Sequence, residues 1–164
     1  MNSYQLRKDQ LTIYIKPSPL FVRAMMFLFS FMLFTLPLFG MISYISEGQG
    51  IKGGFFFAIF IFGLFGFYLL RVALWNTYGK EIIHFDGKIC NYVADYGWFR
   101  DKVKMETFST INFAKNPVGY LEDNNYTLVI EDFNTDQEIM CVAKMKEEEL
   151  EQLIKDLKLL FPEQ

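Results

Sequence analysis

The sequence is poor in the side chains on which most catalytic and metal sites depend. It has one histidine, His84, and two cysteines, Cys90 and Cys141. A single histidine excludes a multi-histidine metal site and any site built on two histidines. The two cysteines are far apart and form no CxxC pair, which argues against zinc. The sequence therefore predicts no metal site and no bound cofactor.

Catalytic motifs are missing as well. The sequence contains no P-loop, no GxGxxG and no serine or cysteine nucleophile motif, so we do not expect an enzyme. His84 is opposite in phase to Ile83 and Phe85 on its strand, which predicts a solvated surface position. Cys90 and Cys141 are expected to be buried free thiols. The alternative is a disulfide, which would require this part of the chain to lie outside the cytosol.

Phenylalanine is abundant but unevenly distributed. The chain has 19 phenylalanines, of which 13 lie between Phe21 and Phe67. A soluble domain spreads such residues along amphipathic elements, so this concentration indicates a region that faces lipid.

Charged side chains are missing from two long stretches. None occurs between Ala24 and Ile45, a run that would span about 33 Å as a helix, against about 30 Å for the bilayer core. Residues 53–70 are also uncharged, and Arg71 can extend its side chain to the interface. We predict transmembrane helices over 21–45 and 53–75, joined by a short polar loop.

Three alternatives to a membrane hairpin are weaker. A cleaved signal peptide does not fit, because the first stretch is too long and begins about twenty residues into the chain. A buried hairpin of a soluble protein does not fit stretches that are apolar on all sides. A transporter or channel does not fit spans whose interiors lack ionisable residues.

The charge distribution predicts the orientation. Residues 1–75 hold 6 basic and 2 acidic side chains, a net charge of +4, whereas residues 76–164 hold 10 and 17, a net charge of −7. The basic residues flank the hairpin on its outer sides, and positive flanks stay inside. We expect an inner (cytoplasmic) membrane protein with both termini cytoplasmic. The acidic C-terminal part argues against nucleic acid as a partner.

The second predicted helix contains small residues at Gly54, Ala58, Gly63 and Gly66. Small side chains let helix backbones approach closely. They are expected to form the contact within the hairpin, and the alternative is a homo-oligomer or a partner contact.

After residue 75 the pattern is that of an α+β domain. The expected strands are 81–85, 88–96, 99–105, 110–114, 126–131 and 137–143. Asp86-Gly87 predicts a type I′ hairpin turn, and 116–125 reads as a loop. An apolar stripe then repeats with helical period, and Pro162 is expected to end the helix. The stripe consists of Leu150, Leu153, Ile154, Leu157, Leu160 and Phe161.

The chain resembles bacterial membrane-anchored proteins that carry a PH-like domain after two transmembrane helices. The resembling segments are 79–87, 99–103, 108–111 and the terminal helix, within roughly residues 78–161. The resemblance implies a bent antiparallel sheet or barrel closed by a C-terminal helix. It divides the chain into a cytosolic N-terminal strand or tail (1–20), a transmembrane hairpin (21–75) and a cytosolic PH-like domain (76–164).

One strand of the seven-stranded PH-like fold is missing from the C-terminal part. Residues 11–15 alternate between apolar and polar side chains, so we expect this segment to pair with the C-terminal sheet. The alternatives are an interfacial amphipathic stretch and a frayed tail.

Two charged clusters are candidate sites. Arg100, Lys102 and Lys104 are spaced by two, which predicts one basic face of a strand for contact with lipid headgroups or an acidic partner. The alternative is a solvated face. A second cluster could attract a cation but lacks EF-hand spacing, so a solvated hairpin tip is favoured. It comprises Asp132, Asn134, Asp136 and Glu138.

These observations predict a non-enzymatic protein of the lipid bilayer. Its cytosolic PH-like domain would bind a protein partner or organise a membrane complex. The alternative is an immunity or antidote protein that neutralises a toxin acting at the membrane.

Overall fold

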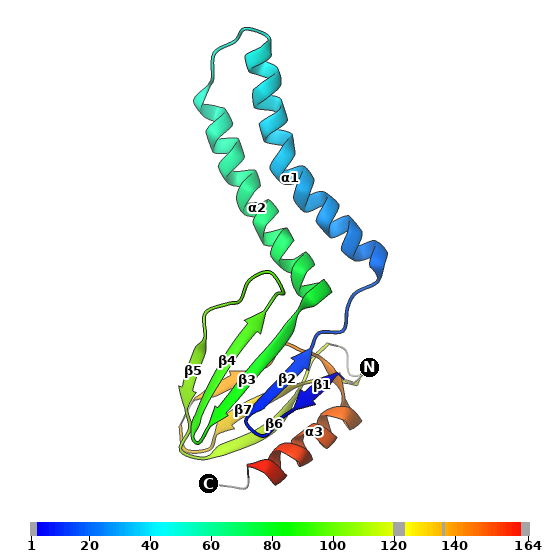
Figure 1. Ribbon diagram of the computed structural model, residues 1–164, viewed down its shortest axis with the longest axis vertical. Coiled ribbons are helices and arrows are strands. Elements are labelled where there is room, and N and C mark those ends of the chain that lie inside the picture. Colours follow the sequence, from blue (N-terminus) through cyan, green and yellow to red (C-terminus); the bar gives the residue numbers. More distant parts are fainter. Residues whose placement is uncertain (1–2, 120–123, 136, 162–164) are drawn as a thin grey trace. The chain divides into compact units, whose positions relative to one another are not determined.

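The computed structural model describes residues 3–119, 124–135 and 137–161. The chain forms two compact units. One unit, Pro17–Thr77, is a pair of helices, and the other combines Met1–Lys16 with Tyr78–Gln164. Figure 1 shows that the second unit contains two sheets and a terminal helix, an α+β arrangement.

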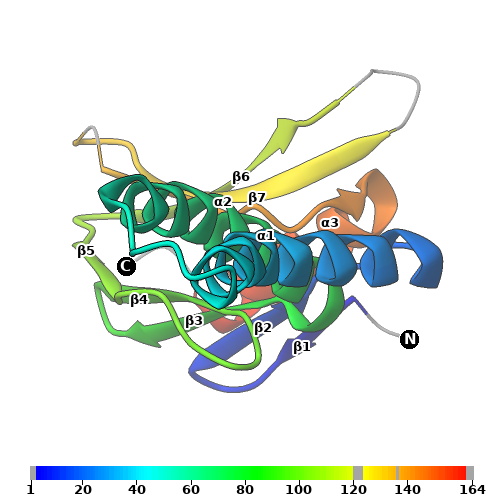
Figure 2. The same cartoon turned by 90° about the horizontal axis from the view of Figure 1, so that it is seen from above.

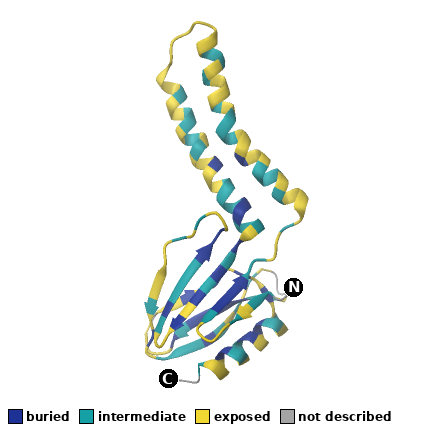
Figure 3. Ribbon diagram, in the orientation of Figure 1, coloured by how far each residue is buried: buried dark blue, intermediate teal, exposed yellow. Residues whose placement is uncertain are grey.

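The helical unit consists of α1 (Leu20–Ser46) and α2 (Gly53–Tyr78), which agrees with the two predicted apolar segments. Both helices are long and apolar enough to cross a membrane. Only 6% of the most apolar 18-residue stretch of each helix is buried, and exposed positions run along both helices in Figure 3. A core helix of a soluble protein would be mostly buried, so these helices present an apolar surface that the chain itself does not cover.

Contacts between α1 and α2 use one of the predicted small residues. The Ser30 hydroxyl donates a hydrogen bond to the Gly66 carbonyl at 2.9 Å. A Cβ on Gly66 would lie 3.0 Å from the Phe34 ring, so this glycine admits the partner helix. Gly54 and Gly63 have open space instead. The contact expected within the hairpin is therefore confirmed at Gly66 and not at Gly54 or Gly63, while Ala58 is half-buried.

The first sheet combines strands from before and after the helix pair in the order β1-β2-β3-β4-β5, all antiparallel. Leu11 of β2 pairs with Ile83 of β3, and Ile13 pairs with Glu81. The expectation that the N-terminal segment joins the C-terminal sheet is thus confirmed. The strands are β1 (Tyr4–Leu6), β2 (Gln10–Tyr14), β3 (Lys80–Asp86), β4 (Ile89–Asp95) and β5 (Lys104–Thr107).

The β3–β4 hairpin turns one residue later than predicted. Asp86 pairs with Ile89 as part of the ladder, so Gly87 and Lys88 form the two-residue turn. Gly87 has a φ of 58°, whereas Asp86 stays in the strand. A glycine with positive φ at the first central position is typical of a type II′ turn. The type I′ prediction at Asp86-Gly87 was therefore wrong.

The predicted strand 99–105 is wrong over 99–103, and only residues 104 and 105 belong to a strand. Arg100 makes only an isolated bridge with Asp95, and β5 begins at Lys104. The intervening loop is shaped by side chains instead: the Gly97 N–H donates to the Asp95 carboxylate at 2.8 Å, and Gly97 has a φ of 87°. These local bonds compete with the ladder, which alternation alone cannot show.

The second sheet has the order β6-β7-β8, with β9 paired to β7 beyond the end of β8. Figure 2 shows the two sheets as separate layers. Their hydrogen-bonded ladders do not join into the predicted closed barrel within the described residues. Part of the predicted loop, 120–123, lies outside the described residues. The strands are β6 (Ile111–Pro117), β7 (Asn125–Asp132), β8 (Glu138–Met140) and β9 (Met145–Lys146).

The terminal helix α3 (Glu147–Leu160) covers the core between the sheets. Leu150, Leu153 and Leu157 are fully buried, as predicted for the apolar stripe. Leu160 is 45% exposed, which corrects the stripe at its end. At about 100° per residue, position 160 lies about 80° from Leu150, whereas Phe161 lies about 20° away. Pro162 lies outside the described residues.

The core contains both cysteines as free thiols. Cys90 is fully buried and Cys141 is 2% exposed. Burial raises the pKa of Cys90 to about 12 and that of Cys141 well above its usual value. Two unreactive, separate thiols agree with the interpretation favoured from the sequence.

Candidate partner-binding groove

A groove runs between β6 and α3 in the α+β unit. One hollow has a volume of about 490 Å³ and a second has about 460 Å³. Phe113 and Lys158 line both hollows, so the two are neighbours. We call them together the β6–α3 groove. Its first hollow is lined by Thr110, Ile111, Asn112, Phe113, Phe133, Lys158 and Phe161.

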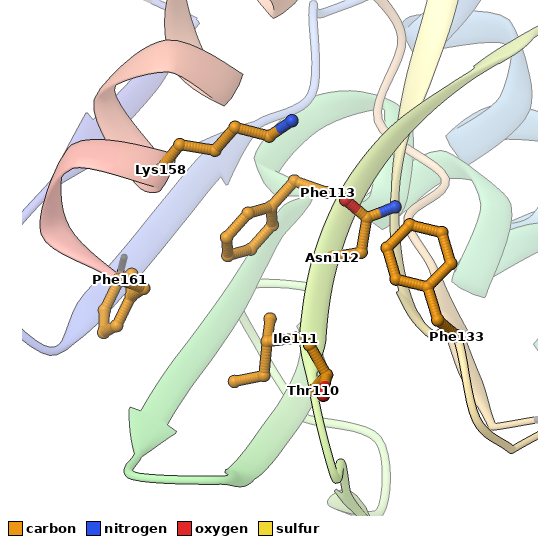
Figure 4. A pocket seen from close by; sticks show the side chains of 7 residues that line it. All are labelled: Thr110, Ile111, Asn112, Phe113, Phe133, Lys158 and Phe161. Atoms are coloured by element: carbon orange, nitrogen blue, oxygen red, sulfur yellow. The ribbon is translucent and has the colours of Figure 1, made fainter. Parts of the chain in front are cut away.

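The groove wraps around one edge of β6. Figure 4 shows Ile111, Phe113 and Phe161 on one side of the β6 ribbon and Asn112 and Phe133 on the other. The floor is aromatic, because the Phe113 and Phe161 ring centroids lie 6.5 Å apart. Phe113 is itself only 4% exposed and belongs to the core. The groove is therefore a shallow extension of the core surface along an edge strand.

The backbone of β6 is open toward the groove. Within the described residues, β6 pairs with β7 alone. The Cys141 N–H donates to the Leu128 carbonyl, so Leu128 directs its backbone polar groups toward β8. Successive residues of a strand direct their backbone polar groups to opposite sides. The N–H and C=O groups of Thr127, Val129 and Glu131 therefore point toward β6.

The residues of β6 that take part in that ladder follow from the register. The partners of Glu131 and Val129 are Asn112 and Ala114. Ile111 and Phe113 alternate with Asn112 and Ala114 along β6, so they direct their N–H and C=O groups to the outer edge. Unpaired strand edges of this kind are templates for pairing with another chain.

Lys115 closes one end of the groove. Its ammonium donates to Glu147 at 2.5 Å and to Glu151 at 2.7 Å, which bridges β6 to the first turns of α3. It also lies 5.3 Å from the Tyr126 ring centroid. The hydrogen bonds to Glu147 and Glu151 raise the pKa of Lys115. The open stretch of the edge is thereby limited to the beginning of β6.

The three basic residues predicted as a contact face are not arranged as expected. Arg100 forms an ion pair with the buried Asp95 at 2.9 Å. Lys104 donates to the Glu138 carbonyl at 2.8 Å and lies 3.6 Å from a Glu106 carboxylate oxygen. Lys102 is exposed in the loop between β4 and β5. They share no strand face, because only Lys104 belongs to a strand.

The predicted acidic cluster also has a structural explanation. Asp132 accepts hydrogen bonds from the Ser109 N–H at 2.5 Å and the Asn134 N–H at 3.0 Å. Burial acts to raise its pKa, but these bonds and that of the Ser109 hydroxyl outweigh it and hold the pKa well below its usual range. Asp136 lies outside the described residues. No group of three metal-ligating side chains occurs in the described part.

His84 is exposed on β3, as predicted. Glu81, on the same strand, was missed: it is fully buried and accepts hydrogen bonds from three donors. They are the Tyr92 hydroxyl at 2.6 Å, the Val142 N–H at 2.7 Å and the Ala143 N–H at 3.0 Å. The signal was present, because Glu81 shares the core-facing phase of Ile83 and Phe85.

The groove residues had no comparable signal. Ile111 and Phe113 were expected on a strand, and Lys158 on a helix, but nothing in the sequence brings the two elements together. The arrangement offers open backbone groups beside an apolar floor. Comparison with protein-family models, curated proteins and solved structures finds no match for this chain.

Proposed function

We propose that this chain is a non-enzymatic membrane protein whose α+β unit binds an extended segment of a protein partner in the β6–α3 groove. Two helices cross the cytoplasmic membrane and anchor the unit on the cytosolic side. The unit itself is a PH-like domain. Its antiparallel sheets, their terminal helix and the preceding helix pair support this assignment.

Membrane insertion is supported by the exposed apolar helices and by the sheet. β2 precedes α1 and β3 follows α2, yet the two strands pair along five residues. The chain must therefore return to the side from which it left, which fits a hairpin that crosses a bilayer twice. The basic flanks of that hairpin favour the cytosol for the α+β unit.

The observation that carries the binding role is the open edge of β6 beside the apolar groove. An extended peptide can add a strand to such an edge, so that backbone hydrogen bonds provide affinity and pockets for alternate side chains provide specificity. Ile111 and Phe113 offer the backbone groups, and Phe161 offers apolar surface. At about 3.4 Å per residue, a peptide of four residues would cover the open stretch.

The rim of the groove suggests the character of the segment. Lys155 and Lys158 line its α3 side and are exposed. A segment with an apolar residue facing Phe113 and Phe161 and an acidic residue beside these lysines is complementary to the groove.

Photocrosslinking in membranes tests this role. A photoreactive residue replaces Thr110 or Lys158, which line the groove, and in a matched control it replaces the exposed His84. We expect the same partner to be captured from both groove positions and not from position 84. Equal capture from position 84, or different proteins from Thr110 and Lys158, would contradict the proposal.

A pair of substitutions at Ile111 tests strand addition itself. Ile111→Pro removes an outward N–H at the first residue of an edge strand, where proline is tolerated. Ile111→Ala removes more of the side chain than Ile111→Pro does but keeps the N–H. We expect the crosslink formed by the photoreactive residue at position 158 to disappear in the Ile111→Pro variant. It should weaken only partly in the Ile111→Ala variant. Equal loss in both would mean that side-chain contacts alone hold the partner.

A further inference from the structure

The loop between β4 and β5 presents a large apolar side chain to its surroundings. Trp98 is 73% exposed and Val103, five residues on, is 49% exposed. Exposed tryptophan is unusual on a solvated surface, and this one lies outside the β6–α3 groove. We call residues 96–103 the Trp98 loop.

The Trp98 loop is held in a defined conformation. The Tyr96 N–H donates to the Phe99 carbonyl at 2.9 Å, and the rings of these two residues stack at 4.7 Å. The Asp101 N–H donates to the Ala94 carbonyl at 2.9 Å. The loop thus fixes its backbone through its own contacts and leaves the Trp98 side chain on the outside, so ordering costs little when Trp98 binds.

The loop lies directly against Tyr78, the residue at which the chain enters its own α+β unit again. A Cβ on Gly97 would be 2.8 Å from the Cβ of Tyr78, the last residue of α2. Tyr78 comes three residues after Trp75, the predicted end of the apolar stretch, which is about 4.5 Å of helix. Each headgroup layer of a bilayer is about 5–8 Å thick. Tyr78, and the loop that touches it, would then be at the level of the headgroups.

Two of the three charged side chains in the loop, Arg100 and Asp101, have local partners, and Lys102 adds one exposed positive charge. Arg100 is paired with Asp95, which also lies 3.7 Å from Lys80. The Tyr96 hydroxyl donates to the Asp101 carboxylate at 3.2 Å. Electrostatic attraction is therefore a small part of what the loop offers, and the indole is the main part. Tryptophan is enriched at membrane–water interfaces, where an apolar ring and a polar N–H are both accommodated.

We propose that the Trp98 loop is a second membrane contact, in which the Trp98 indole inserts into the phospholipid headgroup region beside the exit of α2. This inference rests on the proposed membrane insertion of α1 and α2. Because the indole provides most of the contact, binding of the loop should require a lipid–water interface and should depend only weakly on anionic lipid.

Depth-dependent tryptophan quenching tests the inference. The full chain is reconstituted into phosphatidylcholine vesicles, and Trp75→Phe leaves Trp98 as the only tryptophan. Lipids brominated near the headgroup should remove most of the Trp98 emission, and lipids brominated deep in the acyl chains should remove less. Added phosphatidylglycerol should change the result little.

Two matched variants separate the possible failures. In Trp98→Phe, the remaining Trp75 reports insertion of α2, and its quenching must be present. A second variant combines Trp75→Phe and Trp98→Phe with Phe133→Trp, so that its one tryptophan is at position 133. This position follows the end of β7 and is 72% exposed in the native chain. We expect no quenching there, because position 133 lies at the end of the β3–β4 hairpin that is opposite to Tyr78. Its neighbour Asp132 is bound to Ser109, and the N–H of the adjacent Phe108 donates to the carbonyl of Lys88 in the hairpin turn.

Each outcome bears on a different claim. Unquenched Trp75 would overturn membrane insertion, and with it this inference. Quenched Trp75 with unquenched Trp98 would overturn the loop contact alone. Equal quenching at positions 98 and 133 would also overturn it, because the α+β unit would then lie on lipid without a specific role for the loop.

Discussion

At the residue scale, Glu81 shows how a charged side chain can join two parts of a domain. It stands on β3 but accepts N–H bonds from Val142 and Ala143, which follow β8. Burial raises the pKa of Glu81, while the bonds from Tyr92, Val142 and Ala143 act in the opposite direction. Three donors satisfy both oxygens of the carboxyl group, so its burial leaves neither oxygen without a hydrogen bond.

Replacing Glu81 with leucine should destabilise the domain strongly. The substitution leaves three donors without an acceptor, at about 1–3 kcal/mol each for buried groups, with sharing reducing the sum. Tyr92→Phe removes one donor and should cost about 1 kcal/mol. Denaturant unfolding of the full chain in detergent, followed by a probe of the β-sheets, compares the two. A loss in Glu81→Leu no larger than in Tyr92→Phe would contradict the bridging role.

Asp132 should make the stability of the domain depend on pH in the acid range. Its folded pKa is depressed, so its contribution to stability is fully present above the unfolded pKa of about 3.9 and is lost as the pH falls below it. Asp132→Asn should lower the melting temperature at pH 7 and show a smaller further loss between pH 4 and pH 3 than wild type. Asp86→Asn, at an exposed strand end, is the control. Parallel pH profiles for wild type and Asp132→Asn would count against this role.

At the element scale, α3 is stabilised through one face. Leu157 is fully buried, whereas Leu159 on the same helix is 81% exposed. Leu157→Ala should cost about 2–5 kcal/mol through lost burial and a cavity. Leu159→Ala should change the unfolding free energy by no more than about 0.5 kcal/mol. Thermal unfolding of both variants checks this, and similar melting temperatures would mean that α3 does not pack as described.

The elements that the sequence predicts well are those with a strong internal period. The apolar runs of α1 and α2, the stripe of α3 and the alternation of β2 and β3 each carry their own signal. The 99–105 segment alternates too, but Asp95 binds the Gly97 N–H and Arg100 and shapes a loop there. Such competition between side chain and backbone depends on contacts that the period does not contain.

The candidate groove could not be predicted from the sequence for a related reason. It forms where β6 meets α3, two elements about thirty residues apart, and Lys115 reaches across to Glu147 and Glu151. The open edge of β6 depends on which strand lies last in the sheet. Strand order is a property of the assembled fold, so a single sequence without homologues gives no direct signal for it.

At the scale of the whole molecule, the sheet constrains the topology of the chain. Because β2 and β3 are neighbours in one sheet, residues before α1 and after α2 must lie on the same side of any membrane that the helices cross. The buried thiols make this testable, since Cys90 and Cys141 are shielded and should not react in the folded protein.

Labelling of single introduced cysteines with a membrane-impermeant maleimide tests the account most directly. Gln49→Cys lies between the helices, Gln5→Cys lies on β1 and Glu138→Cys lies on β8, the last two at exposed positions. In cells with an intact cytoplasmic membrane, we predict labelling at position 49 only, with positions 5 and 138 reacting after lysis. Labelling of position 5 or 138 in intact cells, or no protection of any site, would contradict a cytosolic domain on a two-span hairpin.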